Sequence, residues 1–159
     1  MERTIGTLIL LAALGSGIMG GLFFVFSNTI MAAFGKLPPT NGIAAMNSIN
    51  ATILNGAFLA VFMGTAALSV ALLVGWLFGW MPSGGTFALA GALVYLIGII
   101  GVTMVFNVPM NNALAAVQAD SPEGAHLWQD YLARWTMWNH VRTVAGVAGS
   151  ALFILALRG

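Results

Sequence analysis

No charged side chain occurs between Lys36 and Asp120 of this 159-residue chain, and none occurs between Arg3 and Lys36. Only 6% of the residues are charged and 60% are hydrophobic, whereas roughly 25% of the residues are charged in an ordinary soluble domain. Uncharged segments of this length cannot form a water-exposed surface, but the hydrocarbon of a lipid bilayer accommodates them. The sequence therefore predicts one integral membrane domain, with the lipid bilayer as its first partner.

The remaining composition argues against several classes of protein. The formal net charge is +1 and no basic stripe is present, so we expect no nucleic-acid partner. Because the chain has no cysteine, it can form no disulfide, thiolate nucleophile or thiolate-ligated metal site. His126 and His140 would lie about 21 Å apart on one helix, too far to share an ion. We accordingly expect neither a bound metal nor a cofactor.

Apolar runs of about 20 residues or more, enough to cross a hydrocarbon core about 30 Å thick, recur four times along the chain. The four predicted spans cover about residues 4–34, 50–80, 86–106 and 139–157. Ser121 and Pro122 are typical of the cap and first turn of a helix, here an amphipathic one over about residues 121–138. The predicted fold is therefore all-α, a four-transmembrane-helix bundle with an amphipathic connector helix before the fourth span.

Small residues recur on one face of two predicted spans. Gly17 and Gly21 lie one turn apart in the first span, as do Gly98 and Gly101 in the third. Such spacing lets helix backbones approach closely in a membrane. These faces can pack within one bundle or between copies of the chain, so a homo-oligomer stays open as an alternative.

Most of the polar residues are predicted to lie at one end of the bundle. At about 1.5 Å per residue, Arg142 lies about 24 Å from Arg158, so it begins within the apolar zone or at its edge. The same arithmetic places further polar residues on the side of the long connectors: Asn28, Asn50, Asn55, Asn107, Asn111, Asn139 and His140. Polar groups at membrane depth are costly unless they are paired. One polar site, capped by the tryptophan-bearing helix, is the simplest explanation.

Each of these residues also has a purely structural interpretation. Arg142 can extend its head group to lipid phosphates as an interfacial anchor. His140 can be an interfacial histidine with one satisfied nitrogen, and the tryptophans near the fourth span fit an aromatic belt. Asn50 and Asn111 fit helix caps. The polar cluster is therefore a hypothesis about a site and not yet a site.

Four segments of the chain carry a family resemblance: GLFFVFSNTIMAAF (21–34), LPPTNGIAAMNSIN (37–50), GVTMVFNVPMNNAL (101–114) and WTMWNHVRT (135–143). Together they resemble the anthrone-oxygenase-like membrane proteins, and the resemblance covers nearly the whole chain. The members with a named activity convert polyketide anthrones to anthraquinones with molecular oxygen and no evident cofactor. Most bacterial members have no assigned reaction.

The resemblance implies a chemistry for the polar cluster. Loss of a proton from the CH₂ group of an anthrone gives an anion that reduces O₂ directly, so the site needs a base, oxyanion donors and a flat apolar slot. We predict His140 as the base, because a histidine changes its charge near neutral pH. The predicted oxyanion donors are Asn107, Asn28 and Arg142, and the predicted substrate-binding residues are Trp135, Trp138, Phe106, Asn55, Asn111 and Asn139.

The sequence leaves two functions open. The first is a cofactor-independent membrane oxygenase that acts on a hydrophobic, anthrone-like aromatic by histidine-assisted deprotonation and reaction with O₂. The alternative is a non-catalytic membrane protein that binds a lipid or quinone-like small molecule, or an accessory membrane subunit. Both functions require a hydrophobic small-molecule ligand or partner within the bilayer, and for both we expect the bacterial cytoplasmic membrane.

Overall fold

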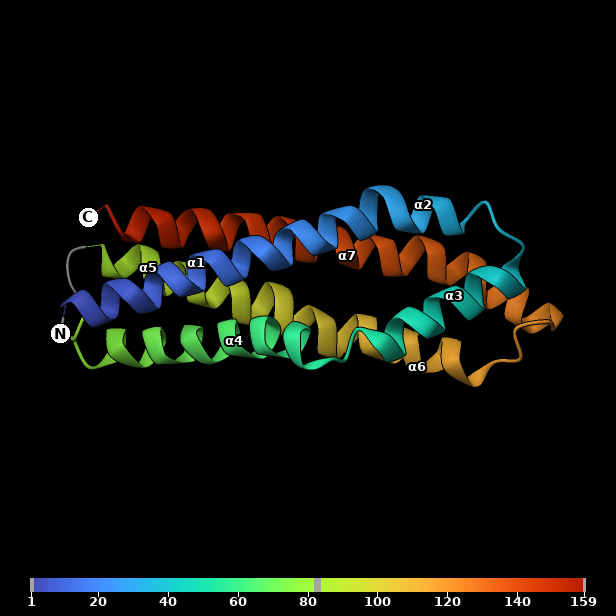
Figure 1. Ribbon diagram of the computed structural model, residues 1–159, viewed down its shortest axis with the longest axis horizontal. Helices are drawn as coiled ribbons and strands as arrows, with labels where there is room; N and C mark the ends of the chain where they lie inside the picture. Colours follow the sequence, from blue (N-terminus) through green and yellow to red (C-terminus); the bar gives the residue numbers. More distant parts are fainter. Residues whose placement is uncertain (1, 82–83, 159) are drawn as a thin grey trace.

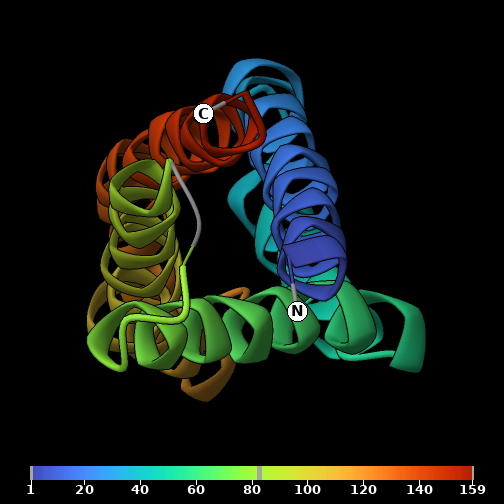
Figure 2. The ribbon, with the colours of Figure 1, turned by 90° about the vertical axis from the view of Figure 1, so that its left-hand side faces the viewer.

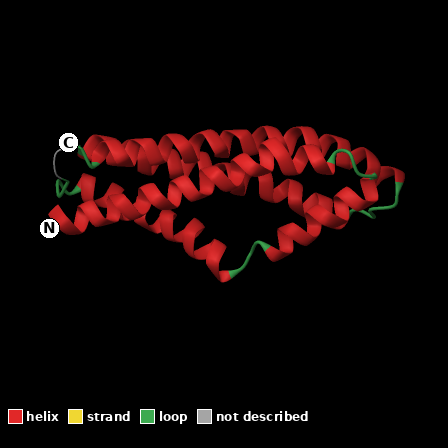
Figure 3. Cartoon of the chain, turned by 45° about the horizontal axis from the view of Figure 1, so that its top comes forward, coloured by secondary structure: helices red, strands yellow, loops and turns green. Residues whose placement is uncertain are grey.

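The fold is a bundle of helices, as predicted for an all-α chain. The computed structural model describes residues 2–81 and 84–158, and all regular secondary structure within them is helical (Figure 3). The α-helices are α1 (Glu2–Val25), α2 (Met31–Phe34), α3 (Pro39–Thr52), α4 (Gly56–Leu77), α5 (Gly85–Tyr95), α6 (Val108–Ala116) and α7 (Pro122–Ala156). The π-helical segments η1 (Phe26–Ile30), η2 (Leu96–Gly101) and η3 (Thr103–Asn107) join some of them into longer rods.

The body of the bundle is formed by α1, α4, α5 and α7. α1 packs on α7, α7 on α5, α5 on α4, and α4 closes the ring against α1 (Figures 1 and 2). The beginning of α1 and the end of α7 lie at the same end of the bundle (Figure 1). The opposite end holds α2, α3, α6 and the start of α7, and we call it the connector end.

In the part of the chain that the structure describes, three helical rods are long and apolar enough to cross a membrane: Glu2–Phe34, Gly56–Leu77 and Gly85–Ala116. They make the chain an integral membrane protein. The π-helical segments lie inside the first and third rods, where a π turn adds a residue without ending the helix. The fourth predicted span lies in α7. This helix is not one of the three rods, because polar residues such as Asn139 and Arg142 at the start of the span lower its mean hydropathy.

Two predicted span boundaries differ from the helices. The prediction starts the second span at residue 50, whereas α4 begins at Gly56 because Asn55 caps it, its side-chain oxygen accepting a hydrogen bond from the Phe58 N–H (3.1 Å). The prediction ends the third span at residue 106, whereas that helical rod continues to Ala116. Pro109 does not end it because this proline lies in the first turn of α6, where a missing N–H is tolerated.

α7 combines the predicted amphipathic helix and the fourth predicted span in one uninterrupted helix. Ser121 caps it as expected, its hydroxyl oxygen accepting a hydrogen bond from the Gly124 N–H (2.9 Å). Trp128, Tyr131 and Trp135 are buried in a cluster at the connector end, where α3 and α6 pack on α7. The first half of α7 therefore lies against the ends of other helices with its aromatic face buried, while its charged residues stay exposed.

Candidate functional site

A cavity of about 460 Å³ lies in the connector end, between α1, α3, α4, η3, α6 and α7. Its wall is mainly apolar, and polar side chains reach it from four of these elements: Asn47, Asn50, Thr103, Asn111, Asn112 and Arg142. Small-molecule sites have volumes in this range and combine an apolar wall with a few polar groups. We call this space the Arg142 cavity and regard it as the candidate site.

The bend between α3 and α4 (Figure 3) contributes Ile53 and Leu54 to the lining of the Arg142 cavity. Three apolar lining residues are more than half exposed, namely Leu54 of the bend (64%), Met63 of α4 (53%) and Met104 of η3 (61%). Met63 and Met104 belong to rods that are apolar enough to cross a membrane. The exposed part of the lining is therefore mainly apolar, with Asn112 as a polar exception, whereas the buried part carries a guanidinium group.

The Arg142 side chain is almost completely buried, since only 6% of the residue is exposed. Its Nη1 donates to Thr103 Oγ1 (3.2 Å) and its Nη2 donates to Asn139 Oδ1 (2.6 Å). The Cζ atom lies 4.4 Å from the centre of the Phe23 ring and 5.1 Å from that of the Trp135 ring. The buried Nε atom has no hydrogen-bond partner. These contacts are all with neutral groups.

Among the residues that the structure describes, no carboxylate pairs with Arg142. Within residues 2–81 and 84–158, the ion pair is Arg134 with Asp130 (3.3 Å), and that pair is exposed on α7. A buried charge without a counter-ion costs free energy, and an anionic ligand would remove that cost. The Arg142 cavity is therefore suited to bind a negatively charged oxygen.

Asn139 holds Arg142 in position. Its side chain is fully buried, and its Nδ2 donates both to the backbone oxygen of Phe23 (2.7 Å) and to Ser27 Oγ (2.6 Å), while its Oδ1 accepts from Arg142. These bonds connect α7 with α1 and η1. Asn139 is not part of the cavity lining, so the structure places this predicted substrate-binding residue as a support for the guanidinium.

Asn111 presents an amide donor to the cavity. Its Oδ1 accepts hydrogen bonds from the Tyr131 hydroxyl (2.8 Å) and from Trp135 Nε1 (2.9 Å). Burial raises the pKa of the Tyr131 phenol, against the smaller opposing effects of Asn50 and Arg142, so the hydroxyl remains a donor. Because an indole N–H can only donate, the amide oxygen must face these rings. The Nδ2 group is then left to face a ligand.

The predicted aromatic slot is divided in the structure. Trp135 lines the Arg142 cavity, whereas Phe106 and Trp138 stack on each other outside the lining, with ring centres 3.5 Å apart and an angle of 6° between the rings. Asn107 is buried beside Trp135, donating from Nδ2 to the Trp135 backbone oxygen (3.4 Å), and its Oδ1 has no partner. Of these four predicted site residues, only Trp135 reaches the cavity.

Three other predicted site residues lie at the surface. His140 is exposed because it is two positions from Arg142 on α7 and therefore faces a different side of the helix. Asn28 is exposed and donates to the backbone oxygen of Phe24 in its own helix (3.0 Å). Asn55 is the exposed cap of α4. None of these side chains lines the Arg142 cavity, so the structure does not bring His140 and Arg142 together in this cavity.

Sequence reasoning missed other residues around the guanidinium. Thr103 contacts Arg142, and Ser27 contacts Asn139, which supports Arg142. Both lie in π-helical segments, where ordinary helical spacing does not predict the direction of a side chain. Tyr131 was accessible to such reasoning, because it precedes Trp135 by one turn on the face of α7 that also carries Arg142. The face of α7 that carries Tyr131, Trp135 and Arg142 is thus the sequence signal that identifies the site.

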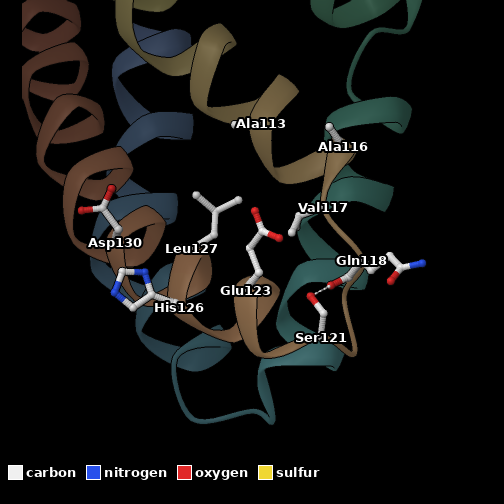
Figure 4. A pocket seen from close by; sticks show the side chains of 9 residues that line it. All are labelled: Ala113, Ala116, Val117, Gln118, Ser121, Glu123, His126, Leu127 and Asp130. Carbon is white, nitrogen blue, oxygen red and sulfur yellow. Dashed lines mark hydrogen bonds between the residues drawn. The ribbon is translucent and has the colours of Figure 1, made fainter.

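A second hollow of about 720 Å³ lies at the tip of the connector end, between the end of α6 and the start of α7 (Figure 4). Its titratable lining residues, Glu123, His126 and Asp130, are all exposed. Figure 4 shows them spread along α7 and not converging on one point. Among the described residues, no group of three or more His, Cys, Asp and Glu side chains could hold a metal ion. This hollow therefore lacks the converging polar groups of the Arg142 cavity.

The comparison with protein families matches the same part of the chain. The family model described as Anthrone oxygenase matches residues 57–152, which is more than half of the sequence. The matched segment begins in α4, ends in α7 and contains Thr103, Asn111 and Arg142 of the cavity. No curated protein and no solved structure gives a match to the chain. The family match thus covers the Arg142 guanidinium and the Asn111 amide, which both line the candidate site.

Proposed function

Because this chain belongs to the anthrone oxygenase family, we propose that it oxidises a hydrophobic, anthrone-like aromatic with molecular oxygen in the Arg142 cavity. The observation that carries the proposal is the buried guanidinium of Arg142, which has no anionic partner among the described residues and lines a mainly apolar cavity. Oxidation of an anthrone passes through an anion whose charge lies largely on oxygen. A fixed positive charge and a fixed amide donor stabilise such an anion.

The proposed reaction consumes one O₂ and releases one water for each anthrone. The substrate loses a proton from its CH₂ group, and the electron pair of that C–H bond becomes delocalised onto the carbonyl oxygen. The anion transfers one electron to O₂, and the resulting radical combines with superoxide to form a C–O bond. The peroxide takes up a proton. Loss of the second C–H proton then breaks the O–O bond, so that the carbon becomes a carbonyl and hydroxide leaves to form water.

The lining residues of the Arg142 cavity include no Asp, Glu or His side chain. In our proposal, water in the cavity therefore accepts the first proton. Arg142 and the Nδ2 group of Asn111 assist this step, because a positive charge and a hydrogen-bond donor stabilise the conjugate base and so lower the pKa of the substrate C–H group. The role of base that the sequence predicts for His140 is not part of the proposal.

Oxygen uptake by the purified protein in lipid nanodiscs tests the proposal directly. With anthrone as substrate, we expect one O₂ consumed per anthraquinone formed over many turnovers, above the uncatalysed rate. The variant His140→Ala should retain kcat to within about twofold, because this exposed side chain does not line the cavity. A loss of about a hundredfold in folded His140→Ala would restore His140 as the base. No product from the wild type would contradict the oxygenase proposal itself.

The indole of Trp135 is expected to act as a positioning group for Asn111. Trp135→Phe keeps an aromatic ring in the cavity wall but removes the N–H that fixes the Asn111 amide. We expect kcat/KM to fall about tenfold, because the amide can then rotate away from the ligand. Trp138→Phe is the matched control, since Trp138 lies outside the cavity lining, and it should leave kcat/KM unchanged. Equal losses in the two variants would show a general structural effect instead.

The second half of α7 completes the proposed arrangement in the membrane. Its outward side chains include Val144, Val147 and Ile154, which are exposed by 68%, 60% and 47%. Apolar groups on the outside of a helix that packs on both α1 and α5 are suited to contact lipid. We therefore propose a four-span bundle, and we place it in the bacterial cytoplasmic membrane.

The exposed apolar residues of the cavity lining also support the alternative of a non-catalytic binding protein. Leu54, Met63 and Met104 would admit a lipid chain or a quinone-like molecule as readily as an anthrone. That function predicts a ligand that copurifies with the protein and is not converted when O₂ is supplied. Product formation over several turnovers would exclude it.

A further inference from the structure

The length of α4 indicates how deep the Arg142 cavity lies in the bilayer. At about 1.5 Å per residue, the 22 residues of α4 extend over about 33 Å, close to the thickness of about 30 Å of a hydrocarbon core. The start of α4 is therefore expected to mark one bilayer surface, and α3 lies beyond it (Figure 1). The lining residues of α4 all lie within about 12 Å of its start: Phe58, Leu59, Phe62 and Met63. The cavity thus lies just inside the bilayer surface.

An amphiphile with one alkyl chain matches this depth. Its charged end lies at the bilayer surface, because a charge is costly in hydrocarbon, and its chain extends into the hydrocarbon. In the cavity lining, Arg142 is the charged group, while Met63 and Met104 are apolar, more than half exposed and part of membrane-spanning rods. Flexible methionine side chains in this position can contact a bound alkyl chain as well as the surrounding lipid.

The guanidinium of Arg142 has hydrogen-bond donors left for such a ligand. Nη1 and Nη2 each carry two hydrogens, and each makes one hydrogen bond, to Thr103 and to Asn139 respectively. In the described part of the chain, no carboxylate pairs with the group. A carboxylate on a ligand would supply both the acceptors and the opposite charge, and charge-assisted hydrogen bonds are about twice as strong as neutral ones. A neutral head group would supply acceptors only.

We propose that the Arg142 cavity binds the anion of a long-chain fatty acid from the bilayer, with its carboxylate on Arg142 and its alkyl chain along Met63 and Met104. This inference goes beyond the proposed function and shares only the cavity with it. The cavity volume of about 460 Å³ lies in the lower part of the range of small-molecule sites, about 300–1,000 Å³. That size favours a single alkyl chain over a phospholipid with two. A fatty acid there occupies the space proposed for the aromatic ligand.

Binding of labelled hexadecanoate to the protein in phosphatidylcholine nanodiscs tests the proposal without O₂ and without turnover. The competing probes are unlabelled hexadecanoate, its methyl ester and hexadecanol, which share one chain, at about pH 8, where a carboxyl group is ionised. We expect saturable binding above that of empty nanodiscs. Unlabelled hexadecanoate should displace the label at concentrations about tenfold or more below those of the ester and the alcohol, because neither of these forms an ion pair with Arg142.

The variant Arg142→Gln identifies the group that holds the carboxylate. Its affinity for hexadecanoate should fall about tenfold or more, while its weaker affinity for hexadecanol should stay unchanged and so show that the cavity is intact. The matched control is Arg134→Gln, which removes an exposed arginine of the same helix and should keep the wild-type affinity. The comparison of acid with ester needs only the wild type, so the proposal stays testable even if Arg142→Gln fails to fold.

Three results would overturn the binding of a fatty acid in this cavity. The first is equal displacement by acid, ester and alcohol, which would mean that only the chain is recognised. The second is wild-type affinity for hexadecanoate in folded Arg142→Gln, which would place the carboxylate elsewhere. The third is displacement by phosphatidylglycerol at concentrations as low as those of the unlabelled acid, which would make an anionic phospholipid the occupant. A failure of anthraquinone to displace hexadecanoate would contradict the proposed function instead and leave the binding of the fatty acid intact.

Discussion

Replacing Arg142 by glutamine is expected to lower kcat for anthrone oxidation by about a hundredfold or more, because loss of one oxyanion-stabilising group has an effect of this size. Glutamine retains an amide that can bond Thr103 or Asn139, but it carries no charge. The conjugate base of the substrate would then lie in an apolar cavity without a counter-ion. Oxygen uptake under saturating anthrone measures the change.

The same experiment includes a matched control on the same helix. Arg134→Gln removes the same charge from an exposed position of α7, where the arginine pairs with Asp130, and exposed ion pairs contribute little. We expect kcat of this variant to equal that of the wild type. Arg142→Lys should recover only part of the activity, because an ammonium group cannot reproduce the planar fork that bonds both Thr103 and Asn139.

The Arg142→Gln result also separates a catalytic role from a structural one. The wild-type guanidinium has no ionic partner among the described residues, so its removal leaves no unpaired carboxylate behind. The folded yield and the melting temperature should therefore be close to those of the wild type while turnover is lost. Equal turnover in Arg142→Gln and Arg134→Gln would contradict the use of the buried charge in the reaction.

The sequence was sufficient to single out Arg142, because span length predicts it within the apolar zone or at its edge, and the structure shows it buried in the bundle. It was not sufficient to predict which neighbours on α7 face the same way. The prediction grouped all polar residues at the start of the fourth span, but His140 and Arg142 point to different sides of one helix. A residue of α7 is buried when it lies on the face that carries Tyr131, Trp135 and Arg142, and exposed when it lies on the opposite face. Its depth in the membrane does not decide this.

The close contacts between helices could likewise be predicted only in part from the sequence. Small residues were correctly predicted to allow close approach in some places, since a Cβ added at Gly98 would lie 2.6 Å from Ala145 Cβ. Gly21, however, faces open space, and the backbone contact between α1 and α7 occurs at Gly20 and Gly146. Spacing along one helix cannot tell which of two adjacent glycines meets a partner, because that depends on how the other helix is rotated.

Gly146→Leu is expected to destabilise the protein by about 3 kcal/mol or more, at the upper end of the cost of overpacking. A Cβ at this position would lie 2.5 Å from the Cα and 2.7 Å from the N atom of Gly20. Backbone atoms cannot rotate away as a side chain can, so α1 and α7 would have to separate. The hydrogen bond from Ser16 Oγ to the Gly146 backbone oxygen (2.9 Å) would be lost as well. Thermal unfolding in detergent, followed by circular dichroism, measures the change.

Gly21→Leu is the matched control, because no atom lies within 4 Å of a Cβ added there. Its melting temperature should equal or slightly exceed that of the wild type, since leucine favours a helix more than glycine does. An unchanged melting temperature in Gly146→Leu would mean that α1 and α7 are not in backbone contact. That contact also matters for the site, because Asn139 bonds the Phe23 backbone one turn beyond Gly20. A stable but widened α1–α7 pair should therefore lose turnover, through a guanidinium that is no longer held over the Phe23 ring.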